Sequence, residues 1–216
     1  MEFAQAREAM INGQLRPNKV GDGELIAAMK AMPREQFVPR AKRDVAYVDE
    51  DLEIVPGRWL MEPIVFARLV QAAQIKHSDA VLDIGCLTGY STCVLAQLAS
   101  AVVGIENDAS LVEKANDNAA AMQLGNAAVL EGGLLDGYAK EAPFDVIFIG
   151  GAVERIPHAL IDQLAEGGRL ITVQIKNGVG RAVLGQKTAG VFGMSDFMDA
   201  QSFLLPGFDL PHTFSF

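Results

Sequence analysis

Cysteine, histidine and basic charge are all scarce in this sequence. Its two cysteines, Cys86 and Cys93, have neither the spacing of a redox pair nor that of a zinc site, and its three histidines are scattered. A disulfide framework and a metal centre are therefore both disfavoured. Acidic residues outnumber basic ones by 27 to 18, which leaves a formal net charge of −9. Because such a chain repels phosphate groups, its composition argues against a nucleic acid or an anionic membrane as partner.

Long apolar runs are also absent. No segment approaches the roughly 20 apolar residues of a membrane span, and residues 1–7 lack the charged-then-apolar order of a secretion signal. We therefore expect a cytoplasmic location. Half of the residues are nonetheless hydrophobic, which excludes a disordered chain. With 216 residues, the chain is long enough to bury a core without disulfides or metal ions.

Residues 1–62 differ from the rest of the chain in their hydrophobic pattern. Apolar residues at helical spacing predict helices over 4–15 and 24–32, and Pro33 ends the second of these. An irregular stretch that carries the only tryptophan is expected over 47–63. We therefore predict an N-terminal helical cap.

From residue 63 onward, short apolar runs alternate with amphipathic segments. Strands are expected over 80–84, 101–105, 127–130, 146–150 and 170–174, and helices over 64–73, 89–98, 110–122 and 157–164. Short runs that are apolar on both faces suit a parallel sheet covered by helices. We therefore predict a doubly wound, Rossmann-like α/β fold with a mostly parallel central sheet.

The last part of the chain has few helix signals. Apolar residues that favour antiparallel strands at the sheet edge are Val183, Val191, Phe197 and Phe203. We expect a single domain over 1–216, made of the cap over 1–62, a core over 63–175 and edge strands over 176–216.

The most informative segment is VLDIGCLTGYS, at residues 81–91, which runs from a predicted buried strand into a helix. An open α/β sheet binds its ligand at such a strand end. Gly85 permits a tight turn and a ligand close to the backbone, and Gly89 lets the next helix pack closely. Glu106 follows the next strand, where a carboxylate can accept both hydroxyls of a ribose.

Two nucleoside ligands compete for this predicted site. A dinucleotide needs the pattern GxGxxG, but Leu87 stands where the middle glycine would be. Asp83 is poorly suited to flank a diphosphate and well suited to an ammonium group. A cationic nucleoside without a diphosphate, such as S-adenosylmethionine, therefore fits better. The plainer reading, in which the two glycines only end a strand, stays open.

Ordered matches along residues 7–174 resemble the protein-L-isoaspartate O-methyltransferases, in particular a variant branch of that family. The matching segments are MINGQLR at 10–16, AMKAMPREQFVP at 28–39, AYVDEDLEI at 46–54, APFDVI at 142–147, and the run from IP at 156–157 to GGRL at 167–170. The resemblance implies a methyltransferase fold and S-adenosyl-L-methionine as cofactor. It also implies methylation of damaged aspartyl carboxylates in a protein or peptide, which is a repair reaction.

The resemblance also assigns residues to the cofactor site. The positions it assigns are Asp83, Gly85, Cys86, Gly89, Glu106 and Gly133. Asp83 replaces the family's commoner glutamate, which is a conservative change. Gly133 stands where the family has an aspartate that contacts the adenine amine, and Asp136 is the nearest acid.

On the acceptor side the chain departs from the family pattern GQTISQP, reading GRWLMEP at residues 57–63. Met61 stands in place of the serine and Trp59 in place of the threonine, so no catalytic residue is assigned. Arg58 and Trp59 become candidate acceptor-site residues, because Arg58 could offer positive charge to an anionic acceptor.

Three functions remain open. The first is an isoaspartyl methyltransferase, which the ordered matches favour. The second is a methyltransferase of the same fold that acts on another acceptor, such as a small molecule, because Trp59 and Met61 make the acceptor side more apolar. The third is a non-catalytic descendant that binds a cofactor or a partner, suggested by the joint departures at Met61, Leu87 and Gly133. A dehydrogenase is disfavoured because GxGxxG is absent.

Overall fold

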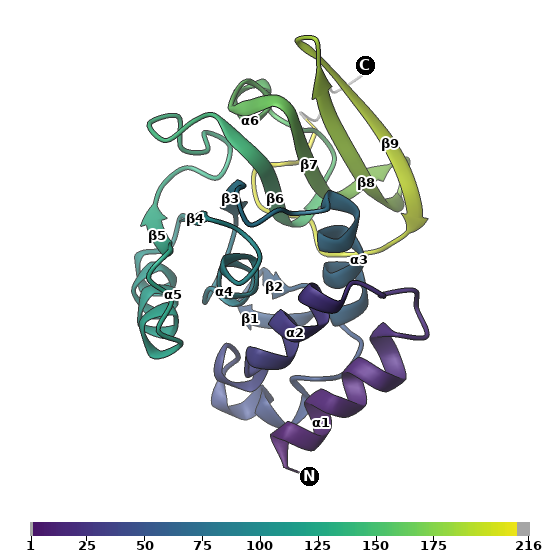
Figure 1. Ribbon diagram of the computed structural model, residues 1–216, viewed down its shortest axis with the longest axis vertical. Helices are drawn as coiled ribbons and strands as arrows, with labels where there is room; N and C mark the ends of the chain where they lie inside the picture. The colour runs from purple at the N-terminus through teal and green to yellow at the C-terminus, as the bar shows by residue number, and fades with distance from the viewer. Residues whose placement is uncertain (1, 211–216) are drawn as a thin grey trace, which may run out of the picture.

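A seven-stranded sheet forms the centre of the computed structural model, which describes residues 2–210 (Figure 1). The strands are β3 (Ala80–Ile84), β4 (Ala101–Glu106), β5 (Ala127–Glu131), β6 (Phe144–Val153), β7 (Leu164–Lys176), β8 (Val179–Thr188) and β9 (Val191–Asp199). Their order in the sheet is β5-β4-β3-β6-β7-β8-β9. The first five strands pair in parallel, and β8 and β9 add to the edge in antiparallel pairing. The predicted fold class is therefore confirmed.

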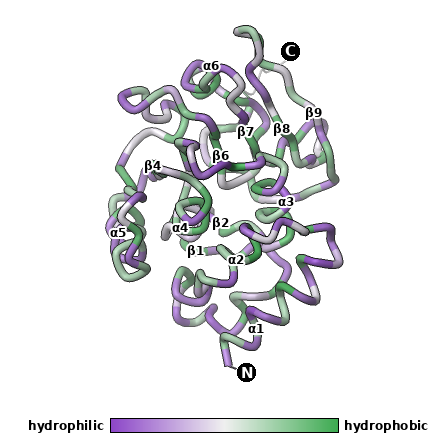
Figure 2. Tube along the Cα trace, in the orientation of Figure 1, coloured by the Kyte–Doolittle hydropathy of each residue, from purple (hydrophilic) through white to green (hydrophobic). Residues whose placement is uncertain are grey.

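Helices cover both faces of this sheet, as a doubly wound fold requires. They are α3 (Pro63–Ala73), α4 (Tyr90–Ala96), α5 (Ala109–Ala121) and α6 (His158–Asp162). Successive side chains of a strand point to opposite faces, and β3 shows this: Val81 joins the cluster that holds α3 and α4, whereas Leu82 and Ile84 join the cluster that holds α6. Figure 2 shows hydrophobic colour concentrated along the central strands. None of the helices in residues 2–210 is long and apolar enough to cross a membrane.

The N-terminal part is helical, as predicted. Helix α1 (Phe3–Met10) continues as a π-helical turn, η1 (Ile11–Leu15), and α2 (Gly23–Ala31) follows. The carboxylate of Asp22 accepts hydrogen bonds from the first N–H groups of α2 and so caps it. Two short 3₁₀ turns come next, η2 (Arg34–Gln36) and η3 (Arg40–Val45). In Figure 1, α1 lies at the opposite end of the molecule from the tip of the β8–β9 hairpin.

The prediction of an irregular stretch over 47–63 is wrong in part. Two short antiparallel strands, β1 (Leu52–Val55) and β2 (Arg58–Leu60), form a hairpin there, joined by a turn at Pro56 and Gly57. The strands are too short to show a period-2 pattern, and the Pro-Gly pair hid them. Along β2, Arg58 and Leu60 are buried and Trp59 between them is half-buried, because alternate side chains point to opposite sides.

The segment that follows β9 crosses back to the end of β6. Ala152 N–H donates to the carbonyl of Phe203 at 2.9 Å, and Leu205 N–H donates to the carbonyl of Ala152 at 2.8 Å. Leu204 forms a parallel bridge with Ala152. The expectation that Phe203 lies in an antiparallel edge strand is therefore wrong, because the chain leaves the edge after β9 and runs alongside β6. We call residues 200–208 the C-terminal strap.

Candidate functional site

The predicted ligand site lies where β3 and β4 end. Gly85 adopts a φ of 76° and its N–H donates to the carbonyl of Ile105 at 2.8 Å, so the loop turns directly beside β4. Leu87 has a φ of 55°, in the left-handed region that glycine adopts freely and that costs other residues roughly 1–2 kcal/mol. The loop thus keeps a glycine-like backbone at a position where this chain has leucine.

Glu106 lies beside this loop, as the parallel topology predicts. It is fully buried, and its Oε2 accepts a hydrogen bond from Leu87 N–H at 2.9 Å. The carboxylate therefore stands at the place from which a Rossmann-like fold contacts ribose hydroxyls.

Arg58 occupies both oxygens of that carboxylate. Its Nη1 donates to Glu106 Oε1 and its Nη2 to Glu106 Oε2, each at 2.6 Å, and Nη1 also donates to Asn107 Oδ1 at 3.0 Å. The Arg58 side chain is 9% exposed and that of Glu106 is 0% exposed. This is a buried, two-pronged ion pair, the strongest geometry available to an arginine and a carboxylate. The charge of Arg58 is thus engaged by Glu106 and is not offered to an acceptor.

Asp83, on β3, faces α4. Its Oδ2 accepts hydrogen bonds from Ser91 Oγ at 2.7 Å and Thr92 Oγ1 at 2.6 Å, while within residues 2–210 Oδ1 has no hydrogen-bond partner. Burial raises the pKa of Asp83 to about 7, against the opposing effect of the two hydroxyls, and the negative charge of Glu106 raises it further. The sequence did not reveal the Ser91 and Thr92 contacts, although both residues stand on the first turn of the helix.

Little space remains between the loop and its surroundings. A methyl group built on Gly85 would lie 3.0 Å from Leu205 Cδ1 and 3.6 Å from Arg58 Nη2. A cavity of about 280 Å³ remains beside the loop, with Met61, Leu87 and Tyr90 among its lining residues. The residues that would contact a nucleoside are present, but in this conformation the side chains of Arg58 and Leu205 lie in the place that a nucleoside would occupy.

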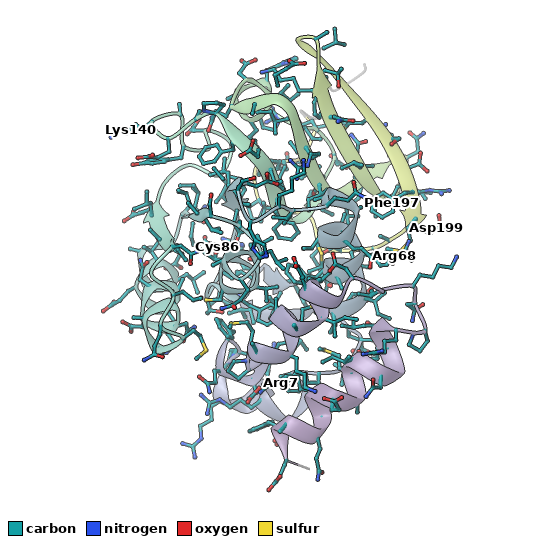
Figure 3. The ribbon with its side chains drawn as sticks, viewed as in Figure 1. Arg7, Arg68, Cys86, Lys140, Phe197 and Asp199 are labelled. Carbon is teal, nitrogen blue, oxygen red and sulfur yellow. The ribbon has the colours of Figure 1, made fainter. Side chains whose placement is uncertain are left out.

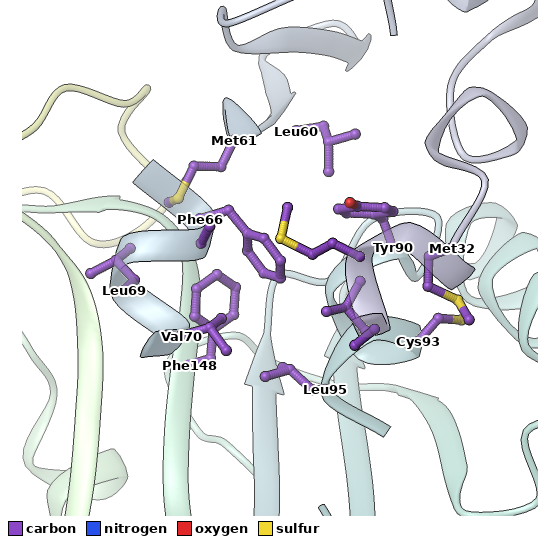
Figure 4. Packing of buried hydrophobic residues seen from close by; sticks show 14 of the residues in the cluster. Met32, Leu60, Met61, Phe66, Leu69, Val70, Tyr90, Cys93, Leu95 and Phe148 are labelled. Atoms are coloured by element: carbon purple, nitrogen blue, oxygen red, sulfur yellow. The ribbon is translucent and has the colours of Figure 1, made fainter. Parts of the chain in front are cut away.

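The acceptor-side residues pack into the protein. Met61, at the family's serine position, is 3% exposed and lies in the hydrophobic cluster shown in Figure 4. Its carbonyl accepts a hydrogen bond from the fully buried Arg34 at 2.7 Å. Trp59 stacks on Phe203 of the C-terminal strap, with ring centroids 3.7 Å apart and planes inclined by 8°. Both residues thus hold the hairpin in place.

An acidic groove opens on the outer side of the hairpin. Its lining includes Glu50, Asp51 and Glu62 together with the stacked pair Trp59 and Phe203. Asp51 ties the groove to the C-terminal strap, because its Oδ2 accepts a hydrogen bond from Ser202 Oγ at 2.7 Å. Partial burial and the neighbouring acids raise the pKa of Glu62 to about 7. Acidic side chains therefore line this groove, with Glu62 partly protonated near pH 7.

The other assigned residues surround the loop. The thiol of Cys86 is buried near the middle of the molecule, whereas Lys140 lies at the rim (Figure 3). Burial raises the pKa of the Cys86 thiol well above its usual value. Gly89 allows α4 to approach α5, since a methyl group there would lie 3.1 Å from Ala115. The space beside Gly133 is taken by the Asp136 carboxylate. Residues 2–210 contain no group of three or more potential metal ligands.

Comparisons with known proteins identify a family that matches most of the chain. The sequence model of the family Protein-L-isoaspartate(D-aspartate) O-methyltransferase (PCMT) matches residues 5–200. A protein-L-isoaspartate O-methyltransferase of Koribacter versatilis is 40% identical over 169 residues, which cover 78% of this chain and 76% of the relative. One of Methanoculleus marisnigri is 38% identical over 165 residues, 76% of this chain and 75% of the relative.

Solved structures show the same fold. One protein-L-isoaspartate O-methyltransferase superimposes with a TM-score of 0.79 at 21% identity; the match covers 95% of this chain and 66% of the other, just under two thirds. A putative member from Plasmodium falciparum, solved in complex with S-adenosyl-L-homocysteine, gives a TM-score of 0.76 at 20% identity, with 91% and 97% coverage.

Proposed function

Because the chain belongs to the protein-L-isoaspartate(D-aspartate) O-methyltransferase family, we propose that it is an S-adenosyl-L-methionine-dependent O-methyltransferase of protein repair. Its substrate would be the free carboxylate of a damaged aspartyl residue in a protein or peptide. The observation that carries the proposal is the position of Glu106, beside the loop that Gly85 opens. We assign to the cofactor side Asp83, Gly85, Cys86, Gly89, Glu106 and Gly133.

The reaction makes modest demands on the protein. A carboxylate with a reference pKa near 4 is already ionised at pH 7, so no general base is needed. Rate then depends on proximity and orientation. Replacing the family's serine by Met61 removes one orienting hydrogen bond, worth roughly 1–3 kcal/mol, or about 5- to 150-fold in rate. Methionine at position 61 is therefore expected to lower methyl transfer without abolishing it.

The direct experiment is transfer of labelled methyl groups from S-adenosyl-L-methionine to an isoaspartyl peptide, with the normal aspartyl peptide as control. We expect base-labile label in the isoaspartyl peptide only, and more of it with Met61→Ser. Saturating protein with no transfer to either peptide would overturn the proposal. Label in a small-molecule fraction would favour a different acceptor. We further propose a cytoplasmic site of action, with no nucleic-acid or membrane partner.

A second candidate is favoured by the ion pair between Arg58 and Glu106. A descendant of the family that uses this fold to bind a partner, without turnover, would have no need of an open nucleoside pocket. Absence of binding of S-adenosyl-L-homocysteine to the wild-type protein at millimolar concentration would select this candidate. Micromolar binding would exclude it.

A further inference from the structure

We infer that Arg58 sets the affinity of this site for a nucleoside. The guanidinium of Arg58 and the ribose of the nucleoside compete for the Glu106 carboxylate, so the carboxylate binds only one of them at a time. The inference rests on the proposed function, and it adds a regulatory contact within the chain. The side chains of Arg58 and Leu205 lie in the place that a nucleoside would occupy.

Competition follows first from the geometry of the carboxylate. The two oxygens of Glu106 offer about four lone pairs. Arg58 donates to each oxygen at 2.6 Å, Leu87 N–H donates to Oε2 at 2.9 Å and Asn107 N–H donates to Oε1 at 2.8 Å. Two ribose hydroxyls would need the same lone pairs. Because hydrogen bonds to a charged group are the strong ones, the nucleoside cannot bind Glu106 fully until the guanidinium leaves.

Side chains also fill the space beside Gly85. Leu205 Cδ1 and Arg58 Nη2 both lie within van der Waals range of a methyl group built on Gly85. That position gives a ligand access to the backbone, and Gly85 is the residue that leaves it open. The chain retains the glycine but fills the space beside it with one side chain from β2 and one from the C-terminal strap.

The two blocking elements are joined to each other, so they are expected to move together. Trp59, next to Arg58, stacks on Phe203. Asp51, which directly precedes β1, accepts a hydrogen bond from the hydroxyl of Ser202. The strap itself is attached to β6 through the two hydrogen bonds of Ala152 with Phe203 and Leu205. Release of Arg58 would therefore disturb the Trp59–Phe203 stack, and Trp59 is the only tryptophan of the chain.

The test is a calorimetric titration with S-adenosyl-L-homocysteine, which cannot donate a methyl group. We expect Arg58→Gln to bind at least tenfold, and up to about a hundredfold, more tightly than the wild type, since one charge-assisted contact no longer competes. Arg58→Lys should lie between them, because a lysine keeps the charge without the two-pronged geometry. Leu205→Ala should tighten binding a few-fold. The control is Arg181→Gln on β8, an exposed arginine paired with Asp199, and it should leave the affinity unchanged.

The possible results of this titration separate the competition at Glu106 from the proposed function. Equal affinities for the wild type and the Arg58 variants would overturn the competition and leave the proposed function intact. Binding by Arg58→Gln alone would support the competition and count against turnover by the wild type. No binding by any variant would overturn both.

Two further measurements apply if Arg58→Gln does not fold. Leu205→Ala leaves the ion pair in place and still tests the steric part. In the wild type, saturation with S-adenosyl-L-homocysteine should change the emission of Trp59 as the stack opens. Binding without any change in emission would contradict the coupled release.

Discussion

The two walls of the ligand site differ in how much of their family's pattern they keep. The wall formed by the ends of β3 and β4 retains Gly85, Gly89 and Glu106, and Asp83 replaces the family's glutamate conservatively. Its backbone turns as a nucleoside-binding loop does. The opposite wall, formed by the β1–β2 hairpin and the C-terminal strap, carries Arg58 where it meets the first wall.

Residues suited to binding a nucleoside therefore do not by themselves make an open site. Glu106 is positioned well, but its partner in this conformation is a side chain of the same protein. The first wall is held by the sheet, whose parallel strands fix it. The second wall is held by the three-residue strand β2, by the aromatic stack and by the C-terminal strap. These few contacts must break before a nucleoside can enter.

The largest effect is expected where the walls meet. Glu106→Gln leaves the buried Arg58 guanidinium without a counter-ion, so the free energy of unfolding should fall by about 3–5 kcal/mol. Chemical denaturation measures this change. As a matched control, Glu8→Gln breaks the exposed pair with Lys30 and should produce no measurable change. Equal, small effects of the two variants would show that the inner pair is not buried as described.

A pH effect on the first wall should be next in size. The pKa of Asp83 is raised to about 7 in the folded protein, against about 3.9 unfolded, so folding favours the protonated acid. Its contribution to stability is therefore fully present below about pH 4 and is lost as pH rises from there through about 7. Between pH 5 and pH 8 the wild type should lose on the order of 2–3 kcal/mol relative to Asp83→Asn. Parallel pH profiles of the two proteins would refute the raised pKa.

The strap should show a smaller effect on the second wall. Leu205 is 4% exposed and packs on Gly85, so Leu205→Ala should lower the free energy of unfolding by about 2 kcal/mol, at the low end for buried leucines. The neighbouring Leu204 is 36% exposed, and Leu204→Ala should change stability by less than about 0.5 kcal/mol. If both variants behave alike, the strap does not pack against the loop.

The smallest effect concerns the aromatic stack that joins hairpin and strap. A double-mutant cycle with Trp59→Ala and Phe203→Ala should give a coupling energy of about 0.5–1.5 kcal/mol. Thermal or chemical unfolding of the four proteins supplies the cycle. A coupling energy indistinguishable from zero would mean that the two elements move independently.

The sequence predicted the first wall better than the second. Its strands are continuous apolar runs, and parallel pairing brings their carboxyl ends together, so the proximity of Glu106 to the loop followed from the pattern. The β1–β2 hairpin gave no such signal, since its strands have four and three residues. Arg58 and Glu106 are 48 positions apart. Nothing local indicates that they meet, and only the alternation along β2 turns Arg58 inward.

The most direct test of the central claim observes Arg58 itself. In the free protein, the buried ion pair should slow rotation of the guanidinium and give resolved ¹⁵N–¹H signals from its Nη groups, identified by their loss in Arg58→Gln. Titration with S-adenosyl-L-homocysteine should remove these signals in proportion to the bound fraction, because Glu106 changes partner. Persistence of the signals at full occupancy of the site would contradict the account.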